Sequence, residues 1–146
     1  MTEVGKQIAE GRVVIKNVKD LKVYKLAYKL AMEVFEISKK FPAEERCSLT
    51  DQIRRSSRSV SINIREGYAK RRYEQVFIRH LNDSLGSSEE TRGWLDFAKD
   101  CKYITQTDRF LTDYYYNPCI GKYIEQFVIL SAAKNLNFTT KRKTLY

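Results

Sequence analysis

Residues 48–72, SLTDQIRRSSRSVSINIREGYAKRR, decide the fold class that we expect of this chain. Within this stretch, apolar and small side chains recur at three- and four-residue steps or their sums, which keeps them on one face of an α-helix. The residues on this face are Leu49, Ile53, Val60, Ile64 and Gly67, with Ser56, Ser57 and Asn63 among or beside them. Because the face is narrow and partly small, we expect a neighbouring helix to approach it closely.

Residues at both ends of this segment are typical of helix caps. The hydroxyl of Ser48 can cap free backbone amides, and Asp51, three residues later, lies near the positive end of the helix dipole. Gly67 suits a left-handed C-terminal cap because it has no side chain. We therefore expect the helix to run from Ser48 to about Gly67.

Residues 21–41 predict an earlier helix with a similar apolar stripe. Its members are Val23, Leu26, Ala27, Leu30, Val34, Ile37 and Phe41. Pro42 lacks an amide donor and disfavours the helical conformation at the preceding residue, so we expect the helix to end there.

Residues 73–103 predict a third and longer helix. Its core candidates are Phe77, Leu81, Leu85, Trp94, Leu95, Ala98 and Cys101. Its middle, residues 84–88, is small and polar and contains Gly86. A glycine in an exposed helix costs about 1 kcal/mol relative to alanine, so we expect Gly86 to mark a close backbone contact.

A fourth helix is expected beyond residue 108. Its apolar positions are Phe110, Leu111, Tyr115, Ile120, Ile124, Phe127 and Val128. Pro118 interrupts them and predicts a kink or break near residues 114–117. Four amphipathic helices with short connections predict an all-α fold, an antiparallel up-down-up-down four-helix bundle. We expect the bundle domain over residues 20–137, a flexible N-terminal arm over residues 1–19 and a basic C-terminal tail over residues 138–146.

Composition agrees with a helical domain and argues against several other classes. Two prolines and six glycines in 146 residues favour long helices. The three cysteines are odd in number and in no metal-ligand spacing, which argues against a disulfide framework or a zinc site. The N-terminus has no signal-peptide pattern, and the apolar run at residues 127–130 is too short to cross a bilayer. We expect a cytoplasmic protein without a membrane partner.

The positive charge is concentrated. The chain carries a net charge of +9, whereas residues 54–72 hold seven basic residues against one acid, Glu66, and residues 134–146 hold four basic residues and no acid. A concentrated basic field points to a polyanionic partner, and arginine suits bidentate phosphate contacts. The candidate nucleic-acid-binding residues are Arg54, Arg55, Arg58, Arg65, Lys70, Arg71, Arg72 and Arg79.

Helical angles place part of this charge in a stripe. At about 100° per residue, Arg54, Arg58 and Arg65 fall together on the side of their helix away from its apolar face. Ile62 lies next to the stripe and is predicted on the surface, either as an ordinary exposed residue or as an interface residue. The alternative for the arginines is a solvated face paired with acids such as Glu44, Glu45 and Glu74. Among tyrosines, Tyr68 and Tyr73 could equally stack on unpaired bases or bridge the core and water.

The residue types needed for catalysis are sparse. The single histidine, His80, has no glutamate three residues before it and is expected at the boundary or surface. The glycines form no phosphate-binding loop, and Glu89 and Glu90 are adjacent and so point differently along a helix. We therefore expect no catalytic residues, no cofactor and no metal.

Several short motifs together resemble a known family. They are Gln52-Ile53-Arg54-Arg55, Ser59, Asn63-Ile64 and Glu66-Gly67-Tyr68, with support from Asp20-Leu21-Lys22-Val23, Lys39-Lys40-Phe41-Pro42, Glu44-Glu45-Arg46, Leu49-Thr50, Phe77-Ile78-Arg79, Leu81-Asn82 and Leu85-Gly86-Ser87. Over roughly residues 20–129 the chain resembles the four-helix-bundle proteins encoded in intervening sequences of bacterial 23S ribosomal RNA genes. The accessory variability proteins of diversity-generating retroelements resemble the same group.

The resemblance implies a four-helix bundle that assembles as a homopentamer and has no established enzymatic activity. For the members tied to retroelements, the resemblance implies that a basic surface contacts nucleic acid and a reverse transcriptase. The residues of this chain at the matching basic positions are Arg54, Arg55, Arg71, Arg72 and Arg79. The chain departs from the family pattern at Ser61, where proline is frequent, at Ile62, where a small residue is frequent, at Pro118, and from Leu130 onward.

The functional expectation is a non-enzymatic, homo-oligomeric bundle that binds RNA or DNA through a basic surface with little sequence specificity. The alternative is an oligomeric protein-interaction scaffold whose basic stripe lies at a subunit or partner interface.

Overall fold

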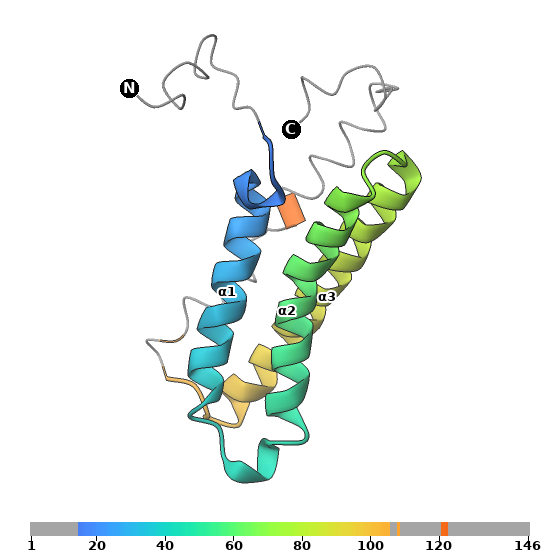
Figure 1. Cartoon of the computed structure of the whole chain (residues 1–146). Coiled ribbons are helices and arrows are strands. Elements are labelled where there is room, and N and C mark those ends of the chain that lie inside the picture. The colour runs from blue at the N-terminus through green and yellow to red at the C-terminus, as the bar shows by residue number, and fades with distance from the viewer. Residues whose placement is uncertain (1–14, 106–107, 109–120, 123–146) are drawn as a thin grey trace, which may run out of the picture.

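Three long helices lie side by side and alternate in direction (Figure 1). A computed structural model describes residues 15–105, 108 and 121–122. Along the chain, the elements are η2 (Val18–Asp20), α1 (Lys22–Ser38), η3 (Ala43–Glu45), α2 (Leu49–Ala69) and α3 (Glu74–Asp100), where η marks a 3₁₀ helix. The described residues are thus all-helical and contain no strand, which confirms the predicted class. The expected fourth helix with Pro118, most of the N-terminal arm and the C-terminal tail lie outside the described residues.

The core forms on both sides of α2, which packs against α1 and against α3. Its side chains Ile53, Val60 and Ile64 are fully buried, as their spacing predicted. The core residues of α1 include Ala27, Leu30 and Val34, and those of α3 include Phe77, Leu81, Leu95 and Ala98. Two of the other predicted core positions on α3, Leu85 and Trp94, are partly buried, whereas Cys101 is exposed and that prediction was wrong.

Short polar side chains join α2 to α3. The Ser84 hydroxyl donates to the Val60 carbonyl at 2.9 Å, and Thr91 Oγ1 donates to Ser56 Oγ at 3.0 Å. Ser84 and Thr91 are completely buried. Small side chains allow two helices to approach, and the hydrogen bonds satisfy hydroxyls that burial would otherwise penalise. This seam explains the small polar middle of α3.

Two glycine predictions were wrong. The helix ends at Ala69, two residues after the expected end, but its C-cap is Lys70, so Gly67 is not the left-handed cap. A Cβ added at Gly67 would lie 2.9 Å from His80 Cβ. Gly67 is therefore a point of close approach between α2 and α3, which agrees with the close helix contact expected on the narrow face that includes Gly67. Gly86, which was predicted to fill that role, is exposed, and an added Cβ there would meet nothing within 4 Å.

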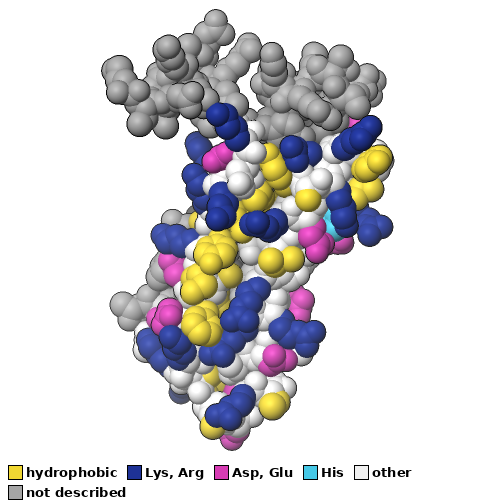
Figure 2. Space-filling model, viewed as in Figure 1, with side chains coloured by type: hydrophobic (Ala, Val, Ile, Leu, Met, Phe, Trp, Pro, Cys, Tyr) yellow, Lys and Arg dark blue, Asp and Glu magenta, His cyan; other side chains and the backbone are white. Residues whose placement is uncertain are grey.

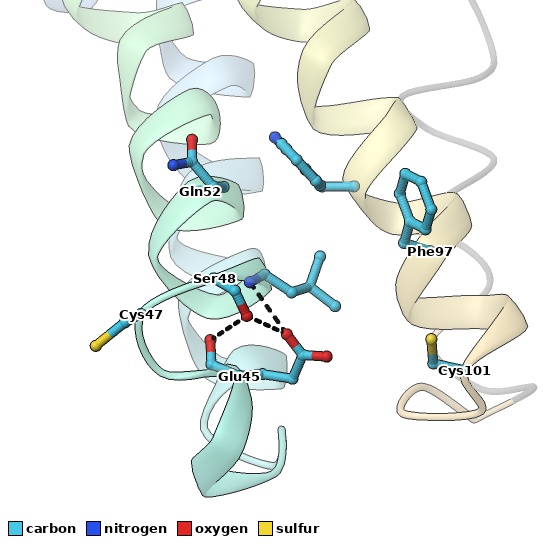
Figure 3. A pocket seen from close by; sticks show the side chains of 8 residues that line it. Glu45, Cys47, Ser48, Gln52, Phe97 and Cys101 are labelled. Atoms are coloured by element: carbon cyan, nitrogen blue, oxygen red, sulfur yellow. Dashed lines mark hydrogen bonds between the residues drawn. The ribbon is translucent and has the colours of Figure 1, made fainter.

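The start of α2 is also capped differently from the prediction. Ser48 is the N-cap residue, but its hydroxyl makes no cap hydrogen bond and instead bonds to the Glu45 carboxylate (Figure 3). Glu45 Oε2 accepts the Leu49 amide at 3.2 Å, and Glu45 Oε1 accepts the Tyr103 hydroxyl at 3.1 Å. Glu45 in η3 therefore supplies the cap and ties this end of α2 to the chain that follows α3.

Candidate nucleic-acid interface

The turn between α2 and α3 presents the predicted basic residues at one end of the bundle. Lys70, Arg71 and Arg72 follow the last residue of α2, and Tyr73 is the N-cap residue of α3. Backbone hydrogen bonds close the turn: the Lys70 amide donates to the Glu66 carbonyl at 3.1 Å, and the Tyr73 amide donates to the Lys70 carbonyl at 2.9 Å. Three consecutive cationic residues are thus held in a short, hydrogen-bonded connection.

Beneath the turn, the contact between Gly67 and His80 fixes the spacing of α2 and α3. His80 was expected at the boundary or surface but is only 6% exposed, because it packs where Gly67 leaves room. Lys70 Nζ lies 3.3 Å from His80 Nε2, and His80 Nδ1 lies 3.7 Å from a Glu66 carboxylate oxygen. An ammonium can only donate, so Nε2 accepts from Lys70, and the proton of a neutral imidazole then lies on Nδ1, facing Glu66.

The arginines of this end differ in how they are held. The Arg71 guanidinium lies over the Tyr68 ring, 4.1 Å from its centroid, and donates to the Tyr68 carbonyl at 2.8 Å. Because Arg71 covers one face of Tyr68 and the residue is 8% exposed, Tyr68 is not open for base stacking. Arg72 and Arg79 are exposed and form no ion pair within the described part of the chain, and Tyr73 is 63% exposed. This end therefore offers exposed guanidinium groups beside an exposed aromatic ring.

The predicted arginine stripe on α2 lies elsewhere, along the junction between α1 and α2. Arg54 Nε donates to Ser38 Oγ at 2.7 Å, and Arg65 donates to the Tyr24 hydroxyl at 3.3 Å. The guanidinium groups of Arg54 and Arg58 lie 4.8 and 5.6 Å from the centroid of the Phe35 ring. Figure 2 shows the result as hydrophobic side chains running along α1 with Lys and Arg side chains on either side. These arginines are cationic but already packed on aromatic and hydroxyl groups of α1.

The acids proposed as alternative partners for the arginines do not pair with them in the described residues. Arg55 pairs instead with Asp51 on its own helix, at 3.8 Å, and both side chains are exposed. Such an exposed pair contributes little to stability. The structure thus separates the eight candidate residues into a bundle-end group (Lys70, Arg71, Arg72, Arg79), a junction group (Arg54, Arg58, Arg65) and Arg55.

Ile62 is 51% exposed, which confirms its predicted place on the surface. Its interface role stays a prediction. The sequence reasoning missed the other exposed apolar side chains on this side, Tyr28 and Met32 of α1, which are 55% and 45% exposed. With Phe35 they recur at four- and three-residue steps, a signal that was present in the sequence.

A hollow of about 620 Å³ lies at the opposite end of the bundle, between the start of α2 and the end of α3 (Figure 3). Its lining includes Glu45, Cys47, Phe97 and Cys101. Among the described residues that line the hollow, Glu45 is the only carboxylate. It is used in the cap of α2, where the Ser48 hydrogen bond, followed by the Leu49 amide, lowers the Glu45 pKa. The Cys47 thiol points away from Cys101 (Figure 3). We assign no chemistry to this hollow.

Two features of the described residues bear on other classes of function. No helix among them is both long and apolar enough to span a bilayer. They contain no cluster of three or more histidine, cysteine, aspartate or glutamate side chains that could hold a metal ion.

A comparison with protein families decides the relationship. The model of the family described as 23S rRNA-intervening sequence protein matches residues 19–115, more than half of the chain. The chain belongs to this family. The match covers α1, α2 and α3 entirely and includes both arginine groups. No curated protein matches the chain.

At Ser61, where the sequence departs from the pattern of the 23S rRNA-intervening sequence proteins, α2 runs without a break. Ser61 lies inside this helix, which is continuous from Leu49 to Ala69, and its hydroxyl donates to the Arg58 carbonyl at 3.0 Å. Ile62 projects outward from the same uninterrupted segment. Pro118 lies outside the described residues.

Proposed function

We propose that this protein is a non-enzymatic, homo-oligomeric four-helix bundle of the cytoplasm that binds RNA or DNA with little sequence specificity. The observation that carries the proposal is the hydrogen-bonded basic turn at residues 70–72, to which α3 adds Arg79. Arg72 and Arg79 are exposed and form no ion pair in the described residues, so a phosphate contact does not first require an internal pair to break.

The partners of this function follow from the resemblance. A homopentamer would repeat the basic turn five times in one particle and would strengthen a weak phosphate contact through multivalency. A reverse transcriptase or another nucleic-acid enzyme is the proposed protein partner.

Binding of labelled single-stranded and duplex oligonucleotides, measured by fluorescence anisotropy over a salt series, tests the proposal. Wild-type affinity is expected to fall steeply with salt because each phosphate contact releases counterions. The double variant Arg72→Gln/Arg79→Gln removes two contacts per chain and should reduce the magnitude of the log–log salt slope by about 1.5 to 2. Unchanged affinity and slope would exclude this end as the binding surface.

A matched control removes the same charge from the other end of the bundle. Arg46 precedes α2 and Lys99 lies in the last turn of α3, and both are exposed. Arg46→Gln/Lys99→Gln is expected to keep the wild-type salt slope. If the two double variants bind equally poorly, only net charge matters and no defined interface exists.

A further inference from the structure

The junction of α1 and α2 carries an apolar ridge that no described part of the chain covers. Tyr28 and Met32 are about half exposed, and Phe35 follows one turn later on the same side of α1. Across the junction, α2 exposes Ile62. Single exposed apolar residues are ordinary, but three exposed ones beside the partly buried Phe35, on two packed helices, mark an interaction surface.

Cations frame this ridge and are held in place. Lys39, Arg54 and Arg58 all lie over the Phe35 ring, at 4.7, 4.8 and 5.6 Å from its centroid. Arg65 is bonded to Tyr24. Within the described residues, none of the three arginines has an acidic partner, so the surface combines apolar anchors with uncompensated positive charge.

The outer side of α3 has the opposite character. The residues at three- and four-residue steps along this side are Asp83, Gly86, Glu90, Gly93 and Phe97, all of them exposed. An added Cβ would meet nothing within 4 Å at Gly86 or at Gly93. Each such glycine costs an exposed helix about 1 kcal/mol relative to alanine, and no close contact with the described residues compensates for that cost.

The two surfaces match in spacing and in charge. Tyr28 and Phe35 are seven residues apart, as are Gly86 and Gly93, and both separations correspond to about 10.5 Å along a helix. Large side chains of the ridge would fill the gaps left by the glycines, while Asp83 and Glu90 would face the arginines. A nucleic acid would offer phosphates to the arginines but would leave the ridge largely uncovered in water.

We propose that the α1–α2 ridge of one copy of this chain docks against the outer side of α3 in a second copy. The inference rests on the proposed homo-oligomer and specifies its contact. The two surfaces are different, so the interface is heterologous, and the proposed closed homo-oligomer requires that the rotation between successive copies closes a ring. Contact between two identical ridges is disfavoured because it would oppose arginines with arginines.

Charge reversal with rescue tests the contact, with mass measured by light scattering and native mass spectrometry. Arg58→Glu/Arg65→Glu reverses one surface and Asp83→Lys/Glu90→Lys reverses the other. Each double variant is expected to weaken assembly by about 100-fold or more, because like charges then face each other. The quadruple variant restores opposite charges and is expected to recover assembly. Arg46→Glu/Lys22→Glu, which changes exposed cations away from both surfaces, should assemble like the wild type.

Replacement of the two glycines provides a second test of assembly, in which loss of assembly can be distinguished from loss of folding. Gly86→Leu/Gly93→Leu places side chains into open space in the isolated chain and into the ridge in the docked one. Helical circular dichroism is expected to be unchanged and assembly to be lost.

Several results would overturn the contact. These are assembly of the glycine variant, assembly of both charge-reversed double variants, or failure of the quadruple variant to reassemble. A wild-type chain that stays monomeric would overturn the homo-oligomer as well. If the wild type assembles and the variants do also, only this contact fails and the proposed oligomer stands. Oligonucleotide binding by Arg72 and Arg79 is measured in a separate experiment, and its outcome does not depend on this contact.

Discussion

Replacement of Gly67 by alanine is the most direct test of how α2 and α3 approach each other. The new methyl group would lie 2.9 Å from His80 Cβ and 3.3 Å from the Phe77 ring. His80 Cβ is fixed to the backbone of α3, so the helices must separate to admit the methyl group. Overpacking of this kind costs about 1–3 kcal/mol, against a gain of about 1 kcal/mol in helix propensity. The expected net loss of unfolding free energy is therefore up to about 2 kcal/mol.

Gly93→Ala is the matched control because Gly93 also lies within a helix but has open space around it. Its unfolding free energy should rise by up to about 1 kcal/mol, since only the propensity term applies. Both variants are compared by urea unfolding followed by circular dichroism, at a protein concentration low enough to keep the chain monomeric. Equal effects of the two replacements would refute the close approach at Gly67. A shifted α3 would also move the basic turn, so Gly67→Ala should weaken oligonucleotide binding.

Three further predictions concern stability. Hydrogen bonding by Ser48 lowers the Glu45 pKa below its ordinary 4.5, so the ionised carboxylate stabilises the fold above pH 4.5. The melting temperature should therefore fall as the pH is lowered through 4.5 and below, and it should fall less in Glu45→Gln. Burial and then the Glu45 carboxylate raise the Tyr103 pKa to about 12, so alkaline destabilisation should begin above its ordinary 10.0 and weaken in Tyr103→Phe. Thr91→Val keeps the volume but removes the hydroxyl that donates to buried Ser56 Oγ, while Ser56 keeps its own bond to the Ile53 carbonyl. The expected cost is about 1 kcal/mol in urea unfolding, and a neutral effect would contradict the hydrogen-bonded seam.

Periodicity along one helix was enough to predict the core face of α2. Ile53, Val60 and Ile64 are buried because a single helix with one apolar side has only one way to turn toward its neighbours. The same reasoning placed Ile62 on the surface. These predictions depend only on the angle between residues of one element.

The roles of the glycines and of His80 could not be predicted in the same way. They depend on where two helices cross, and a sequence alone does not give that position. Gly67 looked like a helix end and Gly86 looked like a contact, yet the crossing lies at Gly67 and buries His80. The contact of Arg54 and Arg58 with the Phe35 ring could likewise not be predicted from the sequence, because it depends on the rotation of α1 relative to α2.

The arginines of α2 and those of the turn that follows it share a positive charge, but their surroundings suit different kinds of partner. At the turn, Arg72 lies in the open beside a solvent-exposed ring, an arrangement suited to phosphates and unpaired bases. At the junction, Arg58 lies over Phe35 beside the exposed Met32, an arrangement that favours a partner offering both acids and apolar or small residues. The two groups should therefore respond independently to mutation. Changes at the turn should alter the salt dependence of oligonucleotide binding without altering the mass of the particle. Changes at the junction should lower the mass of the particle. The affinity for oligonucleotides should then fall only because multivalency is lost, and the salt slope of binding by each monomer should stay unchanged.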